Sequence, residues 1–509
     1  MSGERDVVIV FDCGSSKLRI AALDEACRIV AQESAPNSPK PQPGGEPTWR
    51  IWDLEEIWGK LCALTRRFMK SIEGRFNPIA TTIATWGADG VPIKRDGTTT
   101  YYAISWMCPR TSRIAEEVSK RMDPWEIFRI TGYQIIVFNT LHRLIWLRRH
   151  APSALEEAHT WLMMPGYFSY KLTGALHIDP TSGSTMMAMD LGKRDWSEEM
   201  LALAGLDPSF FPEWREPGEV LGEVTEEAAR QTGLPRGLPV VVGGHDTQFA
   251  ILAANPAADQ AALSSGTWEI LALRLNRYDP SREAYELGVV IEADVEPGFW
   301  NPQFLMPASL VLEWVRRLMY REEVENVYEV MVGEAERVPA GAGGLILLPS
   351  FMPDTGPTKA YGIPGVILGL TPFVERGHIY RAALEGLSYQ LRLAIEGLEK
   401  AFGVKLSGVK VVGGGSKNRL WNKIRADVTG RLIVTSRIRE ATVAGAALTA
   451  FKGAGRFRSF KEALASMEAG LESHAPGESS GKYDELYKVY LELYPVLAGA
   501  LKRVKGGRR

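Results

Sequence analysis

Short apolar runs alternate with helical patterns along most of this chain. Two of the apolar segments, "VVIVFDCGSSKLRI" (7–20) and "AALSSGTWEILALRL" (261–275), are each divided by a turn of small residues, as in a strand, a tight turn and a returning strand. Apolar residues recur at helical spacing at 53–72, where Asp53 is placed as the N-cap, and at 380–402. This alternation of strands and helices predicts an α/β fold.

The second half of the chain repeats the order of elements of the first half. The two strand–turn–strand segments lie about 250 residues apart, and "NPAADQ" interrupts the pattern between them. We therefore expect two similar lobes that face one another, at 1–254 and 255–475, followed by a C-terminal helix and a basic tail at 476–509. The apolar segment at 238–254 is expected to be strand-like.

Composition and charge narrow the class of protein. The 509 residues suggest roughly two to four domains, and 45% hydrophobic with 24% charged residues is ordinary for a soluble globular protein. The formal net charge of -2 gives no indication of a nucleic acid or an anionic membrane as partner. No apolar stretch has the length of a membrane span, and the four cysteines are scattered, which predicts a soluble cytoplasmic protein with reduced thiols.

Two turns rich in Gly and Ser have the composition of phosphate-binding loops. In "DCGSSK" (12–17) and "SSGTWE" (264–269), small residues let backbone N–H groups approach an anion. Either turn alone is more typical of a purely structural hairpin. Because the two occupy equivalent places in the two halves, we expect both to approach one polyphosphate from opposite sides. Asp12 would then hold Mg²⁺ beside the phosphates, with a turn-capping role as the alternative.

A third turn carries a candidate general base. Asp246 in "GGHDTQ" (243–248) follows the apolar run "LPVVV" and is flanked by Gly and small polar residues. Phosphoryl transfer to a hydroxyl needs a group that accepts the alcohol proton and orients the oxygen, and Asp246 has the chemistry for this role. An Asx turn without any catalytic role is the alternative for this residue.

Taken together, these segments resemble the FGGY carbohydrate kinases. The resemblance extends in order from about residue 6 to residue 455. It implies an α/β fold of two ribonuclease-H-like lobes, as in the actin-like ATPases, with a central cleft, and it implies ATP, Mg²⁺ and a ketose as ligands. The resemblance implies that Asp246 is the base and that Asp12 and Asp246 are the metal ligands. It implies that phosphate is bound by Asp12, Gly14, Ser15, Ser16, Lys17, Ser265, Gly266 and Thr267. It also implies that adenosine is bound by Gly413, Gly414, Gly415 and Asn418.

Sugar recognition needs a few directed polar groups over an apolar or aromatic floor. The candidates are Asp89 in "TWGADG", Trp106 and Arg110 in "WMCPRT", His245 and Gln248. A core aromatic is the alternative for Trp106, and a surface ion pair is the alternative for Arg110.

Within the family, "WMCPRT" (106–111), "GHDTQFA" (244–250) and "GGGSKNRLWNKIRAD" (413–427) are most similar to the members that phosphorylate L-fuculose at O1. L-rhamnulose and D-ribulose are the alternative ketoses. Two features depart from the family pattern: Arg143 stands where a Lys is expected, and "DTGPTKAYG" (354–362) replaces a Gly-Glu-Arg loop.

An actin-like or chaperone-type ATPase is the alternative from another class, although only about 50 residues follow position 455, too few for a separate peptide-binding domain. The sequence leaves open whether the chain forms a homodimer.

Overall fold

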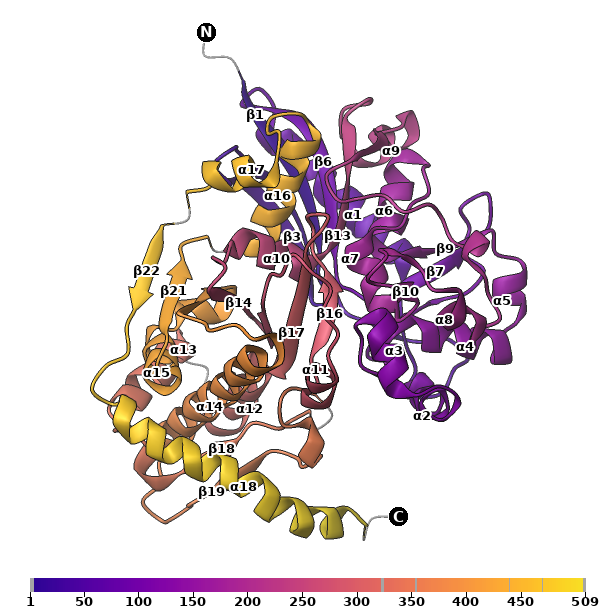
Figure 1. Cartoon of the computed structure of the whole chain (residues 1–509). Coiled ribbons are helices and arrows are strands. Elements are labelled where there is room, and N and C mark those ends of the chain that lie inside the picture. Colours follow the sequence, from indigo (N-terminus) through magenta and orange to yellow (C-terminus); the bar gives the residue numbers. More distant parts are fainter. Residues whose placement is uncertain (1–3, 322–324, 353–354, 439, 469, 507–509) are drawn as a thin grey trace.

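The computed structural model describes residues 4–321, 325–352, 355–438, 440–468 and 470–506, which form two lobes, each built around one large β-sheet (Figure 1). The sheet of the first lobe has six strands in the order β12-β13-β6-β1-β2-β3. Their bounds are β1 (Arg5–Cys13), β2 (Lys17–Leu23), β3 (Ile29–Pro36), β6 (Phe76–Thr85), β12 (Val220–Glu223) and β13 (Pro239–His245). β1 pairs antiparallel with β2 and parallel with β6, and β6 pairs parallel with β13.

The sheet of the second lobe has seven strands in the order β16-β17-β15-β14-β20-β21-β22. Their bounds are β14 (Gln260–Ser265), β15 (Trp268–Ala272), β16 (Val290–Ala293), β17 (Trp300–Pro307), β20 (Gly408–Val412), β21 (Leu432–Ser436) and β22 (Leu471–His474). The run β17-β15-β14-β20-β21 repeats the strand directions of β3-β2-β1-β6-β13, with the antiparallel hairpin followed by two parallel strands. The duplication expected from the sequence is therefore present in the topology.

Helices and short strands complete the first lobe. The helices are α1 (Leu54–Ile72), α2 (Ser112–Arg121), α3 (Pro124–Thr131), α4 (Thr140–His150), α5 (Ser153–Glu156), α6 (Met164–Thr173), α7 (Pro180–Gly183), α8 (Glu198–Ala202) and α9 (Glu226–Thr232). The short strands are β4 (Lys40–Pro41), β5 (Arg50–Trp52), β7 (Gly90–Ile93), β8 (Ala103–Ile104), β9 (Thr160–Met163), β10 (Met189–Asp190) and β11 (Asp195–Trp196).

Further helices and a small two-stranded sheet complete the second lobe. These elements are α11 (Arg282–Leu287), α12 (Ser309–Met319), α13 (Val327–Glu336), β18 (Ile346–Leu348), β19 (Val366–Leu368), α14 (Arg376–Phe402), α15 (Arg419–Thr429), α17 (Phe460–Ser466) and α18 (Ser480–Gly506).

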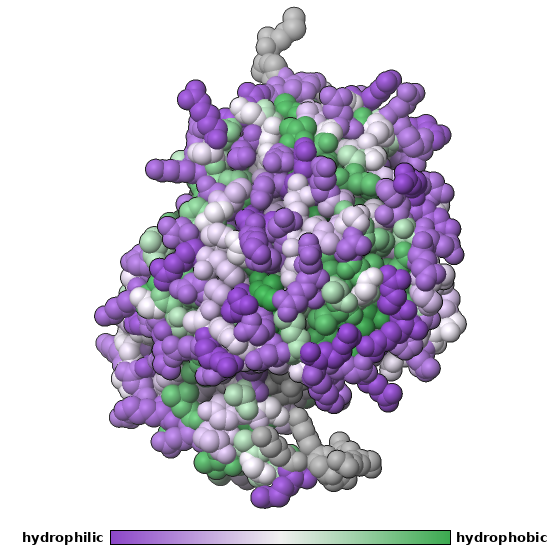
Figure 2. All heavy atoms as spheres, turned by 45° about the vertical axis from the view of Figure 1, so that its right-hand side comes forward, coloured by the Kyte–Doolittle hydropathy of each residue, from purple (hydrophilic) through white to green (hydrophobic). Residues whose placement is uncertain are grey.

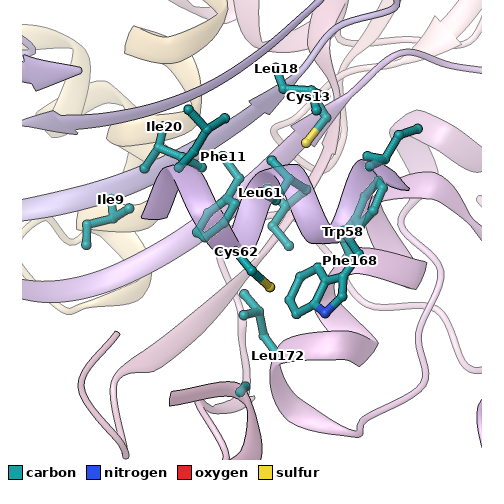
Figure 3. Close-up of a cluster of buried hydrophobic side chains, with 14 of the residues drawn as sticks. Ile9, Phe11, Cys13, Leu18, Ile20, Trp58, Leu61, Cys62, Phe168 and Leu172 are labelled. Atoms are coloured by element: carbon teal, nitrogen blue, oxygen red, sulfur yellow. The ribbon is translucent and has the colours of Figure 1, made fainter. Parts of the chain in front are cut away.

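Helix α1 illustrates how local sequence and packing agree. The Asp53 side chain accepts a hydrogen bond from the Glu56 N–H and so caps the helix, as predicted. One apolar face of α1, which includes Trp58 and Leu61, packs against β1 residues such as Phe11 (Figure 3). Burying a side chain of this size stabilises the fold by about 1.5–3 kcal/mol, which exceeds the differences in helix propensity among residues other than Gly and Pro, about 0.7 kcal/mol at most.

Two helices fill the space between the sheets. They are α10 (Asp246–Ala254) and α16 (Ala441–Gly453), which share one buried cluster with Val8 of β1 and Ala262 of β14. The crossing is close: a Cβ atom on Gly445 would lie 2.0 Å from the carbonyl oxygen of Phe249. The strand-like expectation for 238–254 is therefore wrong beyond His245, where α10 begins. This helix is apolar on every side because it is surrounded by protein, so its sequence lacks the one-sided pattern of a surface helix.

The C-terminal helix α18 lies across the second lobe (Figure 1). Its buried face carries a row of tyrosines at helical spacing, the first three of which have ring contacts with Tyr389 of α14. The row consists of Tyr483, Tyr487, Tyr490 and Tyr494. The face of the molecule shown in Figure 2 is mostly hydrophilic with scattered hydrophobic areas. None of the described helices combines the length and apolar composition needed to span a bilayer.

Candidate active site

Two cavities meet at the turn of the second hairpin. The smaller one, of about 310 Å³, is lined from the first lobe by Ser15, His245 and Asp246 and from the second lobe by Gly266 and Thr267. The larger one, of about 830 Å³, lies on the second lobe between α12, α13 and the start of α15. Thr267 lines both cavities, so the two cavities adjoin at this residue.

The first hairpin is a tight turn that leaves its tip open. The Gly14 N–H donates to the Lys17 carbonyl (2.9 Å), and Asn37 at the end of β3 braces the turn by donating to the Gly14 carbonyl (3.0 Å). Ser16 and Lys17 are exposed, and Ser15 lines the small cavity. Ser15, Ser16 and Lys17 at the tip of this turn are therefore accessible to an anion.

The second hairpin rests on a buried ion pair. Arg425 of α15 pairs with Glu269 of β15, and both side chains are fully buried. The Ser265 hydroxyl donates to Glu269 (2.8 Å) and accepts from the Arg425 guanidinium (2.9 Å). Ser265, one of the predicted phosphate-binding residues, thus turns its side chain away from the cleft, whereas Thr267 at the tip is exposed. Burial lowers the pKa of Arg425, although the Glu269 carboxylate opposes this shift.

Replacing Arg425 by methionine should destabilise the fold. The change leaves the Glu269 carboxylate buried without its partner, which typically costs about 3–5 kcal/mol of the free energy of unfolding. Chemical denaturation followed by circular dichroism measures this loss. The control is Arg419→Met on the same helix, where the side chain is 80% exposed and its ion pair is a surface contact. Equal stabilities of the two variants would contradict a structural role for the buried pair.

Asp12 and Asp246 are both mostly buried, and Asp246 lines the small cavity. Asp12 ends β1, and Asp246 is the first residue of α10. Burial raises the pKa of Asp12 to about 7, and the negative charges of Asp246 and Glu440 add to this, whereas Arg19 acts in the opposite direction. Burial also raises the pKa of Asp246, against the opposing effect of His245. Two carboxylates that are costly to ionise side by side favour a nearby cation.

His245 joins the candidate base to the second lobe. Its Nε2 atom lies 3.3 Å from Asp246 Oδ1, and its Nδ1 atom lies 3.0 Å from Glu292 Oε2. Burial alone would lower the pKa of His245, but Glu292 and Asp246 together raise it to about 9. Gln248 is buried beneath the cavity and donates to the same Glu292 oxygen (2.6 Å). Glu292 was not a candidate from the sequence.

The glycine-rich turn of the second lobe has two kinds of glycine. A Cβ atom on Gly413 would lie 2.7 Å from the Ser265 carbonyl oxygen, and one on Gly415 would lie 2.0 Å from the Ser265 hydroxyl oxygen. A Cβ atom on Gly414 would meet nothing within 4 Å. Close packing against the second hairpin thus requires two of the glycines, and the third faces open space. Asn418 caps α15 by accepting from the Trp421 N–H (3.0 Å) and lines the large cavity.

Comparison with known proteins shows the family. The model of the N-terminal domain of the FGGY family of carbohydrate kinases matches residues 7–253, and the model of the C-terminal domain matches residues 261–454. The chain belongs to this family. The FGGY sugar kinases use ATP as the phosphate donor, so the chain is an ATP-dependent sugar kinase, and the alternative of an actin-like or chaperone-type ATPase is not favoured.

Individual relatives cover nearly the whole chain. It is 36% identical to the L-fuculokinase of Escherichia coli (strain K12) over 463 residues, which are 91% of this chain and 95% of that protein. It is 32% identical to the L-fuculokinase of Haemophilus influenzae, with 91% of this chain and 98% of that protein covered. The xylulose kinase of Rhodospirillum rubrum has a similar fold, with a TM-score of 0.85 at 24% identity, and 97% of this chain and 100% of that chain are covered.

The first departure from the FGGY pattern, Arg143, has a clear structural role. Its guanidinium pairs with Asp89 Oδ1 (2.8 Å) and donates to the Ala88 carbonyl, and both charged side chains are at most 1% exposed. Asp89 Oδ2 accepts from Trp52 (2.5 Å) and Trp86 (2.9 Å). Asp89, a sugar-binding candidate, is therefore engaged by protein donors beneath the cavity. Burial raises its pKa, although Arg143 acts in the opposite direction.

The two candidates of "WMCPRT" lie in different surroundings. Trp106 lines the small cavity beside Phe138, with its ring edge-on to that ring at 6.4 Å between centroids. Arg110 stacks over Trp49 (4.2 Å to the ring centroid) and donates to Gln42 (2.7 Å), outside the cavity lining. Of this pair, only Trp106 has direct access to a ligand in the cavity.

The second departure from the FGGY pattern is the loop at 354–362, which contacts both lobes. Residue 354 itself lies outside the described residues. Thr355 lines the small cavity. Lys359 donates across the lobes to the Gln134 side chain (2.6 Å), and burial lowers the pKa of this lysine to about 8. The loop thus contributes a cavity residue and an inter-lobe contact at the same time.

Proposed function

We propose that this FGGY kinase transfers the γ-phosphoryl group of ATP to O1 of L-fuculose, giving L-fuculose 1-phosphate. The observation that best supports this reaction is that Thr267 lines both cavities, while Asp246 and Ser15 line the smaller one. The relatives of at least 32% identity named L-fuculokinase support this ketose. The four cysteines are buried and free, which fits a reducing compartment such as the cytoplasm.

In this proposal the two substrates enter from different cavities. Adenosine binds in the large cavity beside Gly414 and Asn418, where the open glycine leaves room for it. The phosphates extend past Thr267 toward Ser15, so that backbone N–H groups of both hairpins face them. The ketose occupies the small cavity with Trp106 as an apolar wall. Asp246 accepts the proton of the attacking hydroxyl and orients its oxygen.

The carboxylates of Asp12 and Asp246 fit a magnesium ion. Mg²⁺ is usually held through one or two carboxylates, waters and substrate phosphates, and it neutralises charge on the transferring phosphoryl group. Burial, with a smaller effect from the charge of Asp246, raises the pKa of Asp12, so a cation beside this carboxylate would favour its ionised form. Within the described residues, no group of three or more His, Cys, Asp or Glu side chains is arranged for metal binding, and a site of this two-carboxylate type does not need one.

A panel of ketoses tests the proposed substrate. We expect ADP release that depends on the sugar, with kcat/KM for L-fuculose about 10- to 100-fold above that for L-rhamnulose or D-ribulose. A coupled assay of ADP release gives these values, and analysis of the product identifies the phosphorylated oxygen. A higher kcat/KM for another ketose would refute the choice of L-fuculose while leaving the sugar kinase in place. ATP consumption without any sugar dependence would argue against a kinase site altogether.

A further inference from the structure

The carboxylate of Glu292 lies at the boundary between the lobes. Glu292 belongs to β16 of the second lobe, but its three hydrogen-bond donors come from the first 254 residues. Tyr133 donates its hydroxyl to Oε1 (2.9 Å), and Oε2 is contacted by His245 Nδ1 (3.0 Å) and Gln248 Nε2 (2.6 Å). Both carboxylate oxygens are therefore engaged by the opposite lobe.

The neighbouring strand completes this arrangement. Asn301 of β17 stands directly opposite Glu292 in the sheet register and donates to the Gln248 side-chain oxygen (2.6 Å). The backbone next to Glu292 also contacts the first lobe, because the Ile291 N–H donates a hydrogen bond to the Gly132 carbonyl (2.7 Å). Through Glu292 and Asn301, β16 and β17 thus hold residues on both sides of Asp246, in the segment 245–248 that we call the catalytic turn.

Contacts on several sides fix the ring of His245. Nδ1 faces Glu292, and Nε2 faces Asp246 Oδ1 at 3.3 Å. The backbone of Gly87 lies against the ring, where a Cβ atom would be 2.8 Å from Nε2. If the Glu292 contact is lost, the hydrogen bond that sets the direction of Nδ1 is missing, and the ring is held only from its Nε2 side by Asp246 and the Gly87 backbone.

We infer that Glu292 is a positioning residue, which orients His245 beside Asp246 and makes the geometry of the catalytic turn depend on contact between the lobes. The inference rests on the proposed role of Asp246. Glu292 lies in the wall of the small cavity, but its side chain is 1% exposed and both carboxylate oxygens already accept hydrogen bonds from Tyr133, His245 and Gln248, which leaves no free acceptor for the sugar. Glu292 therefore acts on the substrate only through residues that it holds.

Glu292→Gln tests the inference, because glutamine keeps the size of the side chain but replaces one acceptor oxygen by an N–H donor. We expect kcat to fall about 10- to 100-fold, the cost of a misplaced catalytic group, with the KM for ATP unchanged. The matched control is Glu296→Gln, four positions later, where the carboxylate pairs with Arg274 away from the cavity lining. The control should keep the kcat of the unmodified enzyme.

A double-mutant cycle separates positioning from general damage to the fold. If Glu292 acts through His245, then adding Glu292→Gln to His245→Ala should cause no further loss of kcat. Additive losses, or a normal kcat in Glu292→Gln alone, would overturn the inference. If circular dichroism shows that Glu292→Gln does not fold, Glu292→Asp replaces it, because aspartate keeps the charge but is shorter by one methylene. We expect the same loss of kcat in this variant and no further loss when it is combined with His245→Ala. Failure of the proposed function has a different signature, namely normal turnover in Asp246→Asn.

Discussion

Asp246→Asn should lower kcat by about 10² to 10⁴-fold, the usual contribution of a general base, while the protein stays folded. Asparagine has the shape of aspartate and can still accept the hydrogen bond from the Thr247 N–H (2.7 Å) at the start of α10. It cannot accept the proton of the attacking hydroxyl. The coupled ADP-release assay measures kcat, and circular dichroism and the melting temperature report on the fold.

The matched control for this prediction is Asp53→Asn. Asp53 caps α1 through its side chain, and asparagine is an equally good N-cap, so neither stability nor kcat should change. Near-native turnover in a folded Asp246→Asn enzyme would show that another group accepts the proton. A drop that occurs together with loss of secondary structure would have to be assigned to the fold instead.

The parts of the site that could be predicted from the sequence are those encoded by adjacent residues. A short apolar run followed by Gly, Ser and Asp identifies a buried strand and its turn, so the sequence alone makes Asp12, Thr267 and Asp246 candidates. The structure brings Ser15, Asp246 and Thr267 to one cavity because the two hairpins occupy equivalent places in two similar sheets. Their chemical roles stay predictions until variants are measured.

The parts that could not be predicted depend on contacts between distant residues. Glu292 meets His245 across 47 positions and Tyr133 across 159 positions, and in the sequence it is only an acidic residue in an apolar strand. Asp89 was a candidate for the sugar, but its buried contact with Arg143, 54 positions away, could not be read from its own neighbours. Helix α10 was missed for a related reason, since a helix buried on all sides has no polar face to reveal its period.

Asp12→Asn should lower turnover by about 10² to 10³-fold at ordinary Mg²⁺ concentrations, the scale expected when one electrostatic contact to the transferring group is lost. The Mg²⁺ concentration that gives half-maximal activity should rise, because a neutral amide oxygen is a weaker ligand than a carboxylate. Binding of the ketose should be unchanged, because the walls of the small cavity come from other residues, such as Trp106 and His245.

A Mg²⁺ titration of activity, with calorimetry of ketose binding in parallel, distinguishes this role from a structural one. Asp24→Asn, just beyond the other end of β2, is the control, since Asp24 pairs with exposed Arg28 outside the cleft. If Asp12 only capped the turn, its loss would disturb the first hairpin without shifting the Mg²⁺ dependence. An unchanged Mg²⁺ titration in a folded Asp12→Asn enzyme would therefore remove Asp12 from the metal site and leave Asp246 as the remaining predicted ligand.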